Sequence, residues 1–238
     1  MGALSLPVAA VDYIHVARPA HPPSASATTF DVWQVTPRPL YEATKRALDV
    51  TLSLLSLCLL SPLLLLIAAL IKLEDGGPVL FWQWRAGFEG RKFRFYKFRS
   101  MCVDAESRRS ALRAEQECSS PRFKMVRDPR VTRTGRWLRR FSLDEIPQFW
   151  NVVVGDLSLV GPRPPLLEEV AEYEPHQRRR LDVAPGVTCT WQVSGRSLIP
   201  FEQQVELDLA YIRTRSLLLD VQILLRTVPA VLSGRGAH

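Results

Sequence analysis

Histidine and cysteine, on which most metal sites and many nucleophilic active sites depend, are scarce in this sequence. Of its 238 residues, four are histidine and four are cysteine. His15 and His21 lie in a proline-rich N-terminal stretch and His238 is the last residue, so His176 remains as the one histidine inside the expected fold. The cysteines stand far apart and form no C-x-x-C pair, which argues against a zinc site and against a secreted disulfide framework. We therefore expect a fold in a reducing compartment, and catalysis by carboxylates, lysine, arginine or a hydroxyl.

The N-terminal stretch differs in composition from the rest of the chain. Residues 1–40 carry six prolines and no sustained hydrophobic period, which predicts a disordered leader. Its short apolar run has no preceding Lys or Arg, so it does not fit a signal peptide. The patterns described below divide the remainder into a membrane anchor at 41–75, a cytosolic catalytic domain at 76–232 and a tail at 233–238.

One stretch has no charge at all, and it runs for 22 residues from Val50 to Ile71. A helix of this length, at about 1.5 Å per residue, matches a bilayer hydrocarbon core of about 30 Å. A buried core helix is the weaker interpretation, because soluble helices rarely stay apolar on every face for so long. The stretch therefore predicts a membrane segment.

Two features predict how this segment meets the membrane. Lys45 and Arg46 precede it and Lys72 follows it, so both ends favour the cytoplasm. Near the middle, Ser61-Pro62 should kink the helix, because proline lacks the backbone donor and clashes with the preceding turn. A re-entrant helical hairpin, entering and leaving by one leaflet, is favoured over a simple span, although proline kinks also occur in spanning helices.

Aromatic or apolar residues alternate with basic ones from Val79 to Met101. A glycine-flanked bend at 87–90 would turn this stretch into a β-hairpin. Phe93, Phe95 and Phe98 are expected to face a core. The residues expected to point elsewhere are Arg94, Tyr96 and Lys97.

Positive charge is concentrated at residues 122–140, which carry eight basic residues and one acid. This local excess of +7 equals that of the whole chain. Arg133, Arg136 and Arg140 recur at helical spacing and would form one charged face. Beside a membrane segment, such a face predicts contact with phosphate, either of lipid headgroups or of a phosphorylated substrate. The preceding residues, 104–120, predict a polar helix or a mobile loop.

Two adjacent carboxylates, Asp144 and Glu145, follow the basic segment. Ser142 and Glu145 fit an S-x-x-E capping box, which would place both carboxylates in the first turn of a helix. Pro147 leaves the boundary open, because Asp144 could itself be the cap. Either way, the positive end of the helix would favour the ionised carboxylates and attract phosphate. Downstream, Arg163 stands between two prolines, which present its guanidinium with little entropy to lose.

Together these motifs resemble the bacterial sugar transferase family, the monotopic phosphoglycosyl transferases. The matching segments are KRALDV at 45–50, the Ser61-Pro62 break, YKFRSM at 96–101, the long motif from DPRV to GPRP at 128–164, and APGVTCTWQVSGRS at 184–197. The resemblance implies an α+β, mainly helical fold, in which a re-entrant membrane hairpin joins a cytosolic domain with a small β-hairpin and amphipathic interfacial helices. Larger members carry further domains ahead of this unit, so the sequence is expected to be a short form.

The resemblance also implies a reaction, the transfer of a sugar 1-phosphate from a UDP-sugar to undecaprenyl (polyprenyl) phosphate with release of UMP. This would start exopolysaccharide or O-antigen-type glycan assembly at the cytoplasmic face of the bacterial inner membrane. Asp144 is implied as the nucleophile that forms an aspartyl phosphosugar intermediate, and Glu145 as a residue that helps bind Mg²⁺, with Asp144, or assists the lipid phosphate. The residues implied to bind phosphate or substrate are Lys97, Arg163, Arg139, Arg196 and Asp208. The sequence around Trp191 resembles glucose- or galactose-phosphate transferases more than transferases that act on acetamido sugars.

Two other functions stay open from the residues alone. A glycosyltransferase that moves only the sugar would release UDP. A membrane-tethered nucleic-acid-binding protein would explain the pI of 9.6 and the basic helix with Trp137, but would leave the carboxylate pair and the GPRP turn without a role. We therefore expect a UDP-sugar, undecaprenyl phosphate and inner-leaflet lipids as partners, no nucleic acid, and leave a homo-oligomer open.

Overall fold

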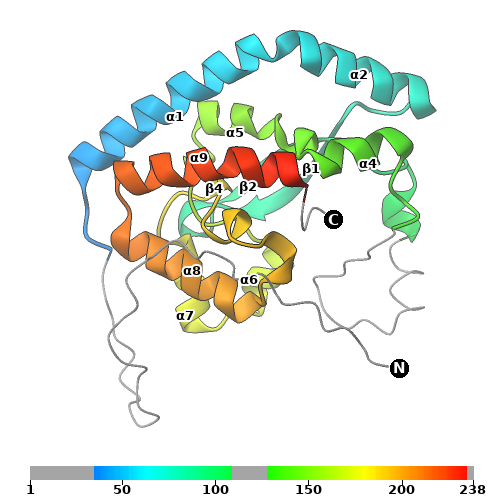
Figure 1. The fold of residues 1–238 in the computed structure, drawn as a ribbon. Helices are drawn as coiled ribbons and strands as arrows, with labels where there is room; N and C mark the ends of the chain where they lie inside the picture. Colours follow the sequence, from blue (N-terminus) through cyan, green and yellow to red (C-terminus); the bar gives the residue numbers. More distant parts are fainter. Residues whose placement is uncertain (1–34, 109–127, 235–238) are drawn as a thin grey trace, which may run out of the picture.

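The computed structural model of the protein describes residues 35–108 and 128–234. The described chain is mainly helical with two small two-stranded sheets, which confirms the predicted mainly helical α+β class (Figure 1). The α-helices are α1 (Pro39–Leu59), α2 (Ser61–Asp75), α4 (Arg133–Arg140), α5 (Gln148–Val154), α6 (Leu167–Ala171), α7 (Pro175–Arg178), α8 (Phe201–Thr214) and α9 (Leu217–Ser233). The strands are β1 (Leu80–Ala86), β2 (Lys92–Phe98), β3 (Ser158–Val160) and β4 (Gly186–Thr188). Short 3-10 turns are η1 (Phe88–Gly90), η2 (Leu143–Glu145), η3 (Arg179–Leu181), η4 (Trp191–Val193) and η5 (Arg196–Leu198). The helix or loop predicted at 104–120 lies mostly outside the described residues.

The first two helices, α1 and α2, form an arch over the domain that is bent by 62° (Figure 1). Pro62 has no N–H to donate to the carbonyl of Cys58, four residues earlier, and the Ser61 hydroxyl donates to that carbonyl instead at 2.8 Å. The predicted break at Ser61-Pro62 is confirmed, but the arch is wide and the helices do not fold back on each other as a closed hairpin. Among the described residues no unbroken helix has the length and apolarity to cross a bilayer, whereas this bent pair meets both criteria when taken together.

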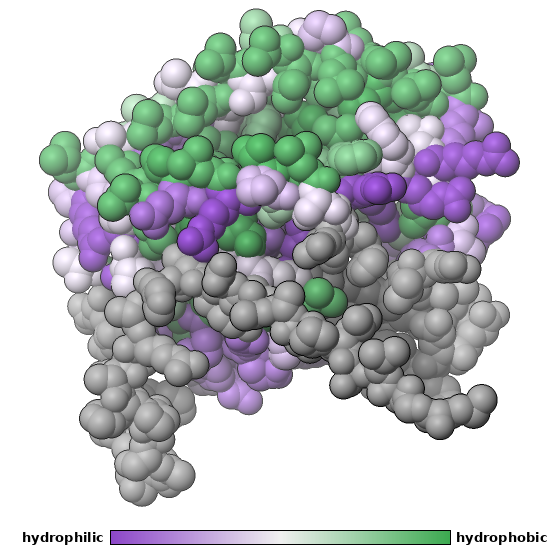
Figure 2. Space-filling view, in the orientation of Figure 1, coloured by the Kyte–Doolittle hydropathy of each residue, from purple (hydrophilic) through white to green (hydrophobic). Residues whose placement is uncertain are grey.

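The arch turns leucines outward, and it buries polar residues on α1 and isoleucines on α2. On α1, Asp49 and Ser53 are buried against the domain, where the helix packs on α5 and β3. On α2, Ile67 and Ile71 are buried beside α4 and the end of β2. The exposed leucines of the arch are Leu40, Leu48, Leu52, Leu54, Leu55, Leu59, Leu65, Leu66, Leu70 and Leu73. Figure 2 shows the apolar surface that they form at the top of the view, above a band of hydrophilic residues.

The last helix, α9, is amphipathic. Its exposed apolar side chains recur every three to four residues and therefore share one face. They are Leu218, Val221, Leu225, Val228 and Leu232. Its buried face carries Asp220 and Ile223, and the helix continues through Pro229.

The β1–β2 hairpin follows the predicted pattern, with one important exception. The strands pair antiparallel around η1, and Phe93 and Phe95 are buried in the main core. Lys97 lies two residues beyond Phe95 and shares its face, with Nζ 5.4 Å from the Phe95 ring. Phe98, on the opposite face, packs in a separate cluster beneath α2. The prediction that Lys97 points away from the face of Phe93 and Phe95 is wrong, because side chains alternate strictly along a strand.

The main core lies between β2, β3, α8 and α9. Phe95, Val160 and Ile212 from three of these elements are at most 1% exposed. β3 and β4 approach so closely that a Cβ on Gly186 would lie 2.1 Å from the backbone nitrogen of Gly161. This glycine contact fixes the chain where it leaves β3 for the proline-rich turn that follows.

Candidate active site

The carboxylate pair lies on η2, between α4 and α5. Ser142 has a left-handed backbone, with φ 53° and ψ 23°, and its side chain makes no capping hydrogen bond. α5 begins only at Gln148, with Pro147 as its N-cap residue. Both predicted starts, the S-x-x-E box and Asp144 as the cap, are therefore wrong, because a capping side chain needs an extended backbone directly before the helix. The 3-10 turn and Pro147 keep the carboxylates in the loop, ahead of the helix.

Helix α4 carries the basic face that the sequence predicts and also sends one arginine to the carboxylates. The exposed arginines are Arg133, Arg136 and Arg140. Gly135 passes so close to the Ser100 carbonyl that a Cβ would lie 2.0 Å from its oxygen. This approach brings Arg139 to the residues that follow β2, where its Nε donates to Ser100 Oγ at 2.9 Å. Arg139 thus lies within the electrostatic reach of Asp144 and Glu145.

Glu145 is bound by two cations. Lys97 Nζ from β2 and Arg163 Nη2 from the turn after β3 each donate to Glu145 Oε1 at 2.9 Å. Burial acts to raise the pKa of Glu145, but the charges of Lys97 and Arg163 and their hydrogen bonds lower it well below its usual range. Glu145 is therefore ionised at neutral pH. Because both cations bind the same oxygen, Oε2 keeps no hydrogen-bond partner within the part of the chain that the structure describes.

Asp144, the preceding residue, has a different environment. It is 6% exposed, and its carboxylate makes no hydrogen bond to any of the described residues. Burial raises the pKa of Asp144 and the charge of Glu145 raises it further, whereas Lys97 and Arg139 act in the opposite direction. The pKa values of two adjacent carboxylates are thus moved in opposite directions, an arrangement that gives each a separate chemical role.

Two further arginines surround the pair. Arg196 in η5 is partly buried, which lowers its pKa, and it interacts with the charges of Glu145 and Arg163. Arg85 of β1 was missed by the sequence analysis. Burial and the charge of Arg163 lower the pKa of Arg85 to about 10, and its Nη1 donates to the Pro164 carbonyl at 2.9 Å. Its position on the face of Lys97 follows from the hairpin register, so extending the alternation through β1 would have found it.

Asp208 of α8, a predicted substrate residue, lies in a separate buried ion pair. Arg180 Nε and Nη2 approach its Oδ2 to 2.8 and 2.6 Å, and Arg180 Nη1 also donates to the Tyr173 hydroxyl at 2.9 Å. Burial raises the pKa of Asp208, and Arg180 acts against that shift. No contact among the described residues joins Asp208 to Asp144 or Glu145. The structure therefore gives Asp208 a buried partner that the sequence did not reveal.

The donors for a metal ion are limited. Among residues 35–108 and 128–234, no three His, Cys, Asp or Glu side chains gather into a metal-binding group. Asp144 and Glu145 offer carboxylate oxygens, the donors that Mg²⁺ prefers. Mg²⁺ is often held by one or two carboxylates together with phosphate oxygens and water. The pair therefore fits Mg²⁺ in combination with a phosphorylated substrate.

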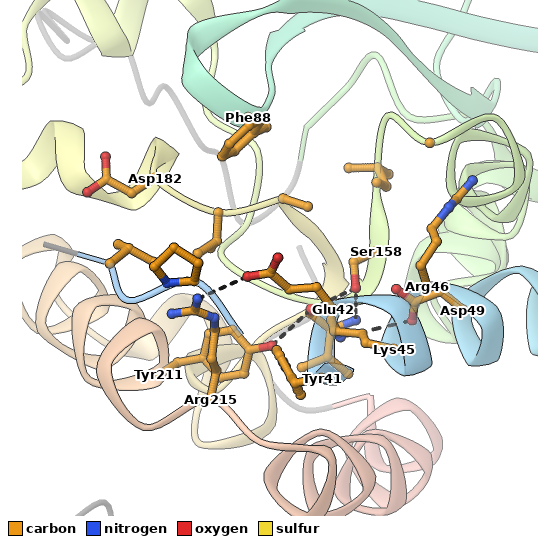
Figure 3. Close-up of a pocket in the computed structure, with 17 residues that line it drawn as sticks. Tyr41, Glu42, Lys45, Arg46, Asp49, Phe88, Ser158, Asp182, Tyr211 and Arg215 are labelled. Atoms are coloured by element: carbon orange, nitrogen blue, oxygen red, sulfur yellow. Dashed lines mark hydrogen bonds and ion pairs between the residues drawn. The ribbon is translucent and has the colours of Figure 1, made fainter. Parts of the chain in front are cut away.

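A cavity of about 470 Å³ lies away from these carboxylates, beside the first turns of α1 (Figure 3). None of the site residues described above lines it. Next to it, Asp220 accepts hydrogen bonds from Tyr41 at 2.9 Å and Lys45 at 3.0 Å on Oδ2, and from Tyr211 at 2.7 Å on Oδ1. We call these four residues the helix latch, because they join α1 to α8 and α9. The cavity is thus bordered by charges that are already paired.

Arginine and lysine side chains gathered in this way can stabilise the negative charge of a transferring phosphoryl group. The chain belongs to the bacterial sugar transferase family, whose profile matches residues 40–234, and this confirms the predicted family. It is 45% identical to the galactosyl transferase CpsE of Streptococcus agalactiae, over 81% of this chain and 43% of that protein. It is 39% identical to the exopolysaccharide production protein ExoY of Sinorhizobium fredii, over 84% of this chain and 91% of that protein. An undecaprenyl-phosphate glucose phosphotransferase of Komagataeibacter xylinus is 43% identical over 84% of this chain and 38% of that protein. The chain thus spans less than half of two of these relatives and most of ExoY.

Proposed function

We propose that this protein transfers a sugar 1-phosphate from a UDP-sugar to undecaprenyl phosphate and releases UMP, with Asp144 as the nucleophile. The contrast between the two carboxylates carries the proposal. Glu145 is fixed by Lys97 and Arg163, whereas Asp144 is buried, raised in pKa and free of hydrogen bonds among the described residues. A carboxylate that must form a bond to phosphorus needs such freedom. Relatives named undecaprenyl-phosphate glucose phosphotransferase, and N-acetylgalactosaminephosphotransferase in Aeromonas hydrophila, support this class of substrates.

The proposed reaction has two displacement steps at one phosphorus. First, an oxygen of ionised Asp144 attacks the β-phosphorus, which bears the sugar. The bond from that phosphorus to the oxygen bridging the two phosphates breaks, and UMP leaves with the bonding electrons. Next, an oxygen of undecaprenyl phosphate attacks the same phosphorus and the Asp144 carboxylate leaves. The products are an undecaprenyl diphosphate sugar and UMP, and no proton is consumed overall.

Each step brings anions together, so it depends on fixed positive charge. Arg139 lies beside Asp144, and Arg163 and Lys97 lie beside Glu145, where they can also meet the oxygens of an entering diphosphate. Mg²⁺, held by Glu145 and Asp144 with the diphosphate, would supply further neutralisation of the departing UMP. No histidine is needed in either step.

The product of the reaction tests this proposal. Purified protein in lipid nanodiscs with Mg²⁺ and undecaprenyl phosphate is assayed for UMP with UDP-glucose, UDP-galactose and UDP-N-acetylgalactosamine. We expect UMP with UDP-glucose or UDP-galactose, and no release by the Asp144→Asn variant. Release of UDP would instead show that only the sugar moves.

We further propose that the arch is a re-entrant anchor in the cytoplasmic leaflet of the bacterial inner membrane, with the catalytic domain in the cytoplasm. The outward leucines of α1 and α2 support insertion, and the apolar stripe of α9 supports contact with the membrane surface. Single cysteines replacing the exposed residues Thr36, which precedes α1, and Val103, which follows β2, in a cysteine-free chain test the topology. We expect a membrane-impermeant maleimide to label both from the cytoplasmic side. Labelling from opposite sides would show a spanning helix.

A further inference from the structure

Helix α1 binds the backbone of the catalytic domain at two places that flank one turn. Arg46 donates from Nη1 to the Val152 carbonyl at 2.5 Å and from Nη2 to the Val153 carbonyl at 2.9 Å. These carbonyls belong to the last turn of α5, where backbone acceptors have no partner within the helix. One turn further along α1, Asp49 Oδ1 accepts the backbone N–H of Leu159 in β3 at 3.2 Å. Figure 3 shows Arg46 and Asp49 close together on α1.

The two elements held in this way lead directly to the site. α5 begins shortly after Glu145, and β3 ends shortly before Arg163. The turn that α1 binds joins the end of α5 to the start of β3. At the other ends of these two elements, Arg163 Nη2 contacts Glu145 Oε1 at 2.9 Å. The chain between Glu145 and Arg163 is therefore a loop closed at one end by an ion pair and held at the other end by α1.

We propose that Arg46 and Asp49 are positioning residues, which fix the turn between α5 and β3 and thereby set the placement of Glu145 against Arg163. Docking of the anchor helix then determines the geometry of the carboxylate pair. Neither side chain touches the reacting atoms. A displacement of about 1 Å at a reacting centre can lower a rate about 100-fold, so a contact distant from the carboxylates can still govern catalysis. The effect on activity rests on the proposed function, whereas the effect on structure does not.

The same helix region provides a matched control. Arg38, directly before α1, also donates to two backbone carbonyls at the end of a helix, those of Arg213 and Arg215 at the end of α8. The chemistry of the contact is the same, but no contact within the described residues connects this helix end to Asp144 or Glu145. Arg38→Ala therefore removes an equivalent attachment of α1 without loosening the turn between α5 and β3.

Steady-state kinetics of the full chain in nanodiscs separate the two attachments. We expect Arg46→Ala to lower kcat for UMP release about 10- to 100-fold with KM for the UDP-sugar changed less than about threefold. Arg38→Ala should keep kcat within about threefold of wild type. Asp49→Ala should resemble Arg46→Ala, whereas Asp49→Asn should restore most of the rate, because the amide oxygen can accept the same backbone hydrogen bond. Equal kcat losses in Arg46→Ala and Arg38→Ala would overturn the proposal.

Hydrogen–deuterium exchange provides a readout that needs no activity. We expect faster exchange in peptides covering 141–147 and 158–165 in both Arg46→Ala and Asp49→Ala, and unchanged exchange there in Arg38→Ala. Faster exchange confined to α5 would overturn the proposal. If no UDP-sugar is turned over by the wild-type chain, the proposed function fails, and the exchange experiment still decides the positioning role.

Discussion

The candidate active site and the helix latch are both built on carboxylates with cationic partners, but they differ in how completely those carboxylates are paired. Both oxygens of Asp220 in the latch accept hydrogen bonds, and its partners come from α1 and α8. In the site, one oxygen of Glu145 is bound twice, and Asp144 is not bound at all among the described residues. A carboxylate with all its bonds made serves structure, whereas one left open in a cationic surrounding is suited to chemistry.

The charge balance of the two clusters differs in the same way. Basic side chains outnumber the two carboxylates of the site, whereas the latch has Lys45 placed between Asp220 and Asp49. The basic side chains that act on the site are Arg85, Lys97, Arg139, Arg163 and Arg196. This excess of cations is the feature that a diphosphate substrate would neutralise.

The cations of the site are mostly guanidinium groups, and Lys97 is the single amine in the set named above. Guanidinium groups keep their charge throughout the physiological pH range and can bind phosphate with two donors at once. The latch contains no such excess of cations. Substitutions in the latch should therefore affect stability, and substitutions in the site should affect activity.

The largest effect on activity is expected from Asp144→Asn. Loss of the nucleophile should lower UMP release by about 10⁴-fold or more. The free energy of unfolding should rise slightly, because burial raises the pKa of Asp144 and so disfavours its charged form in the folded state. Parallel assays of UMP release and chemical unfolding check both parts. A clear loss of stability would instead place Asp144 in the same structural class as Asp220.

Glu145→Gln should have the next largest effect. Removing the charge leaves Lys97 and Arg163 without their partner and should lower kcat/KM about 100- to 1,000-fold. The three side chains are 18 to 24% exposed, so we expect a loss of about 1–3 kcal/mol in the free energy of unfolding. The matched control is Glu42→Gln, whose carboxylate is 53% exposed and pairs with Arg215 at 3.4 Å. Similar activity losses in both variants would contradict the assignment of Glu145 to the site.

The opposed pKa shifts of the pair predict a pH dependence of activity. UMP release requires ionised Asp144, so kcat/KM should fall as the pH drops through its raised pKa, above the usual value of about 3.9. Lys97→Met should move this acidic limb to higher pH, because the charge of Lys97 acts to lower the pKa of Asp144. pH–rate profiles of the first half-reaction, without lipid acceptor, measure the shift. A limb that stays in place would show that Lys97 does not act on Asp144.

Ionisation of Glu145 adds to the free energy of unfolding, whereas ionisation of Asp144, whose folded pKa is raised, subtracts from it. The folded pKa of Glu145 is lowered, so its contribution is fully present above its unfolded pKa of about 4.3 and is lost as the pH falls toward the folded pKa. Chemical unfolding of the wild type and of Glu145→Gln across this range measures the contribution. The difference in stability between the two proteins should shrink as the pH falls, and a constant difference would show that the Glu145 charge contributes nothing.

The smallest effect on activity is expected from Asp220→Asn in the latch. The amide cannot replace all the acceptor positions that Tyr41, Lys45 and Tyr211 use, so the free energy of unfolding should fall by about 1–3 kcal/mol. The rate of UMP release per folded molecule should stay within about threefold of wild type. A loss of rate as large as that of Glu145→Gln, with stability unchanged, would remove the distinction between latch and site.

The sequence predicted the parts of the fold that depend on local pattern. The Ser61-Pro62 break follows from the missing donor of proline, and the hairpin follows from alternation around a glycine-flanked bend. The position of Lys97 was predicted wrongly because Phe98 was assigned to the same face as Phe95, although strand alternation separates them. The predicted helix start near Asp144 was also wrong, because no pattern in the sequence predicts the left-handed backbone conformation of Ser142.

The long-range contacts could not be predicted. Arg46 binds the backbone carbonyls of Val152 and Val153. Every residue has such a carbonyl, so the side chains at these positions do not indicate the contact. Arg180 and Asp208 are 28 residues apart, and nothing in their local sequence indicates that they pair. Such contacts depend on how the elements pack, which is a property of the whole fold.

The most direct test of the central claim is to trap the covalent intermediate. The full chain is incubated with Mg²⁺ and its UDP-sugar in the absence of undecaprenyl phosphate, and intact-protein and peptide mass spectrometry follow. We predict one hexose phosphate added per protein, located on Asp144, with an equal burst of UMP, and loss of the adduct when undecaprenyl phosphate is added. A protein that completes turnover with Asp144 unmodified, or with UDP as the product, would contradict the account.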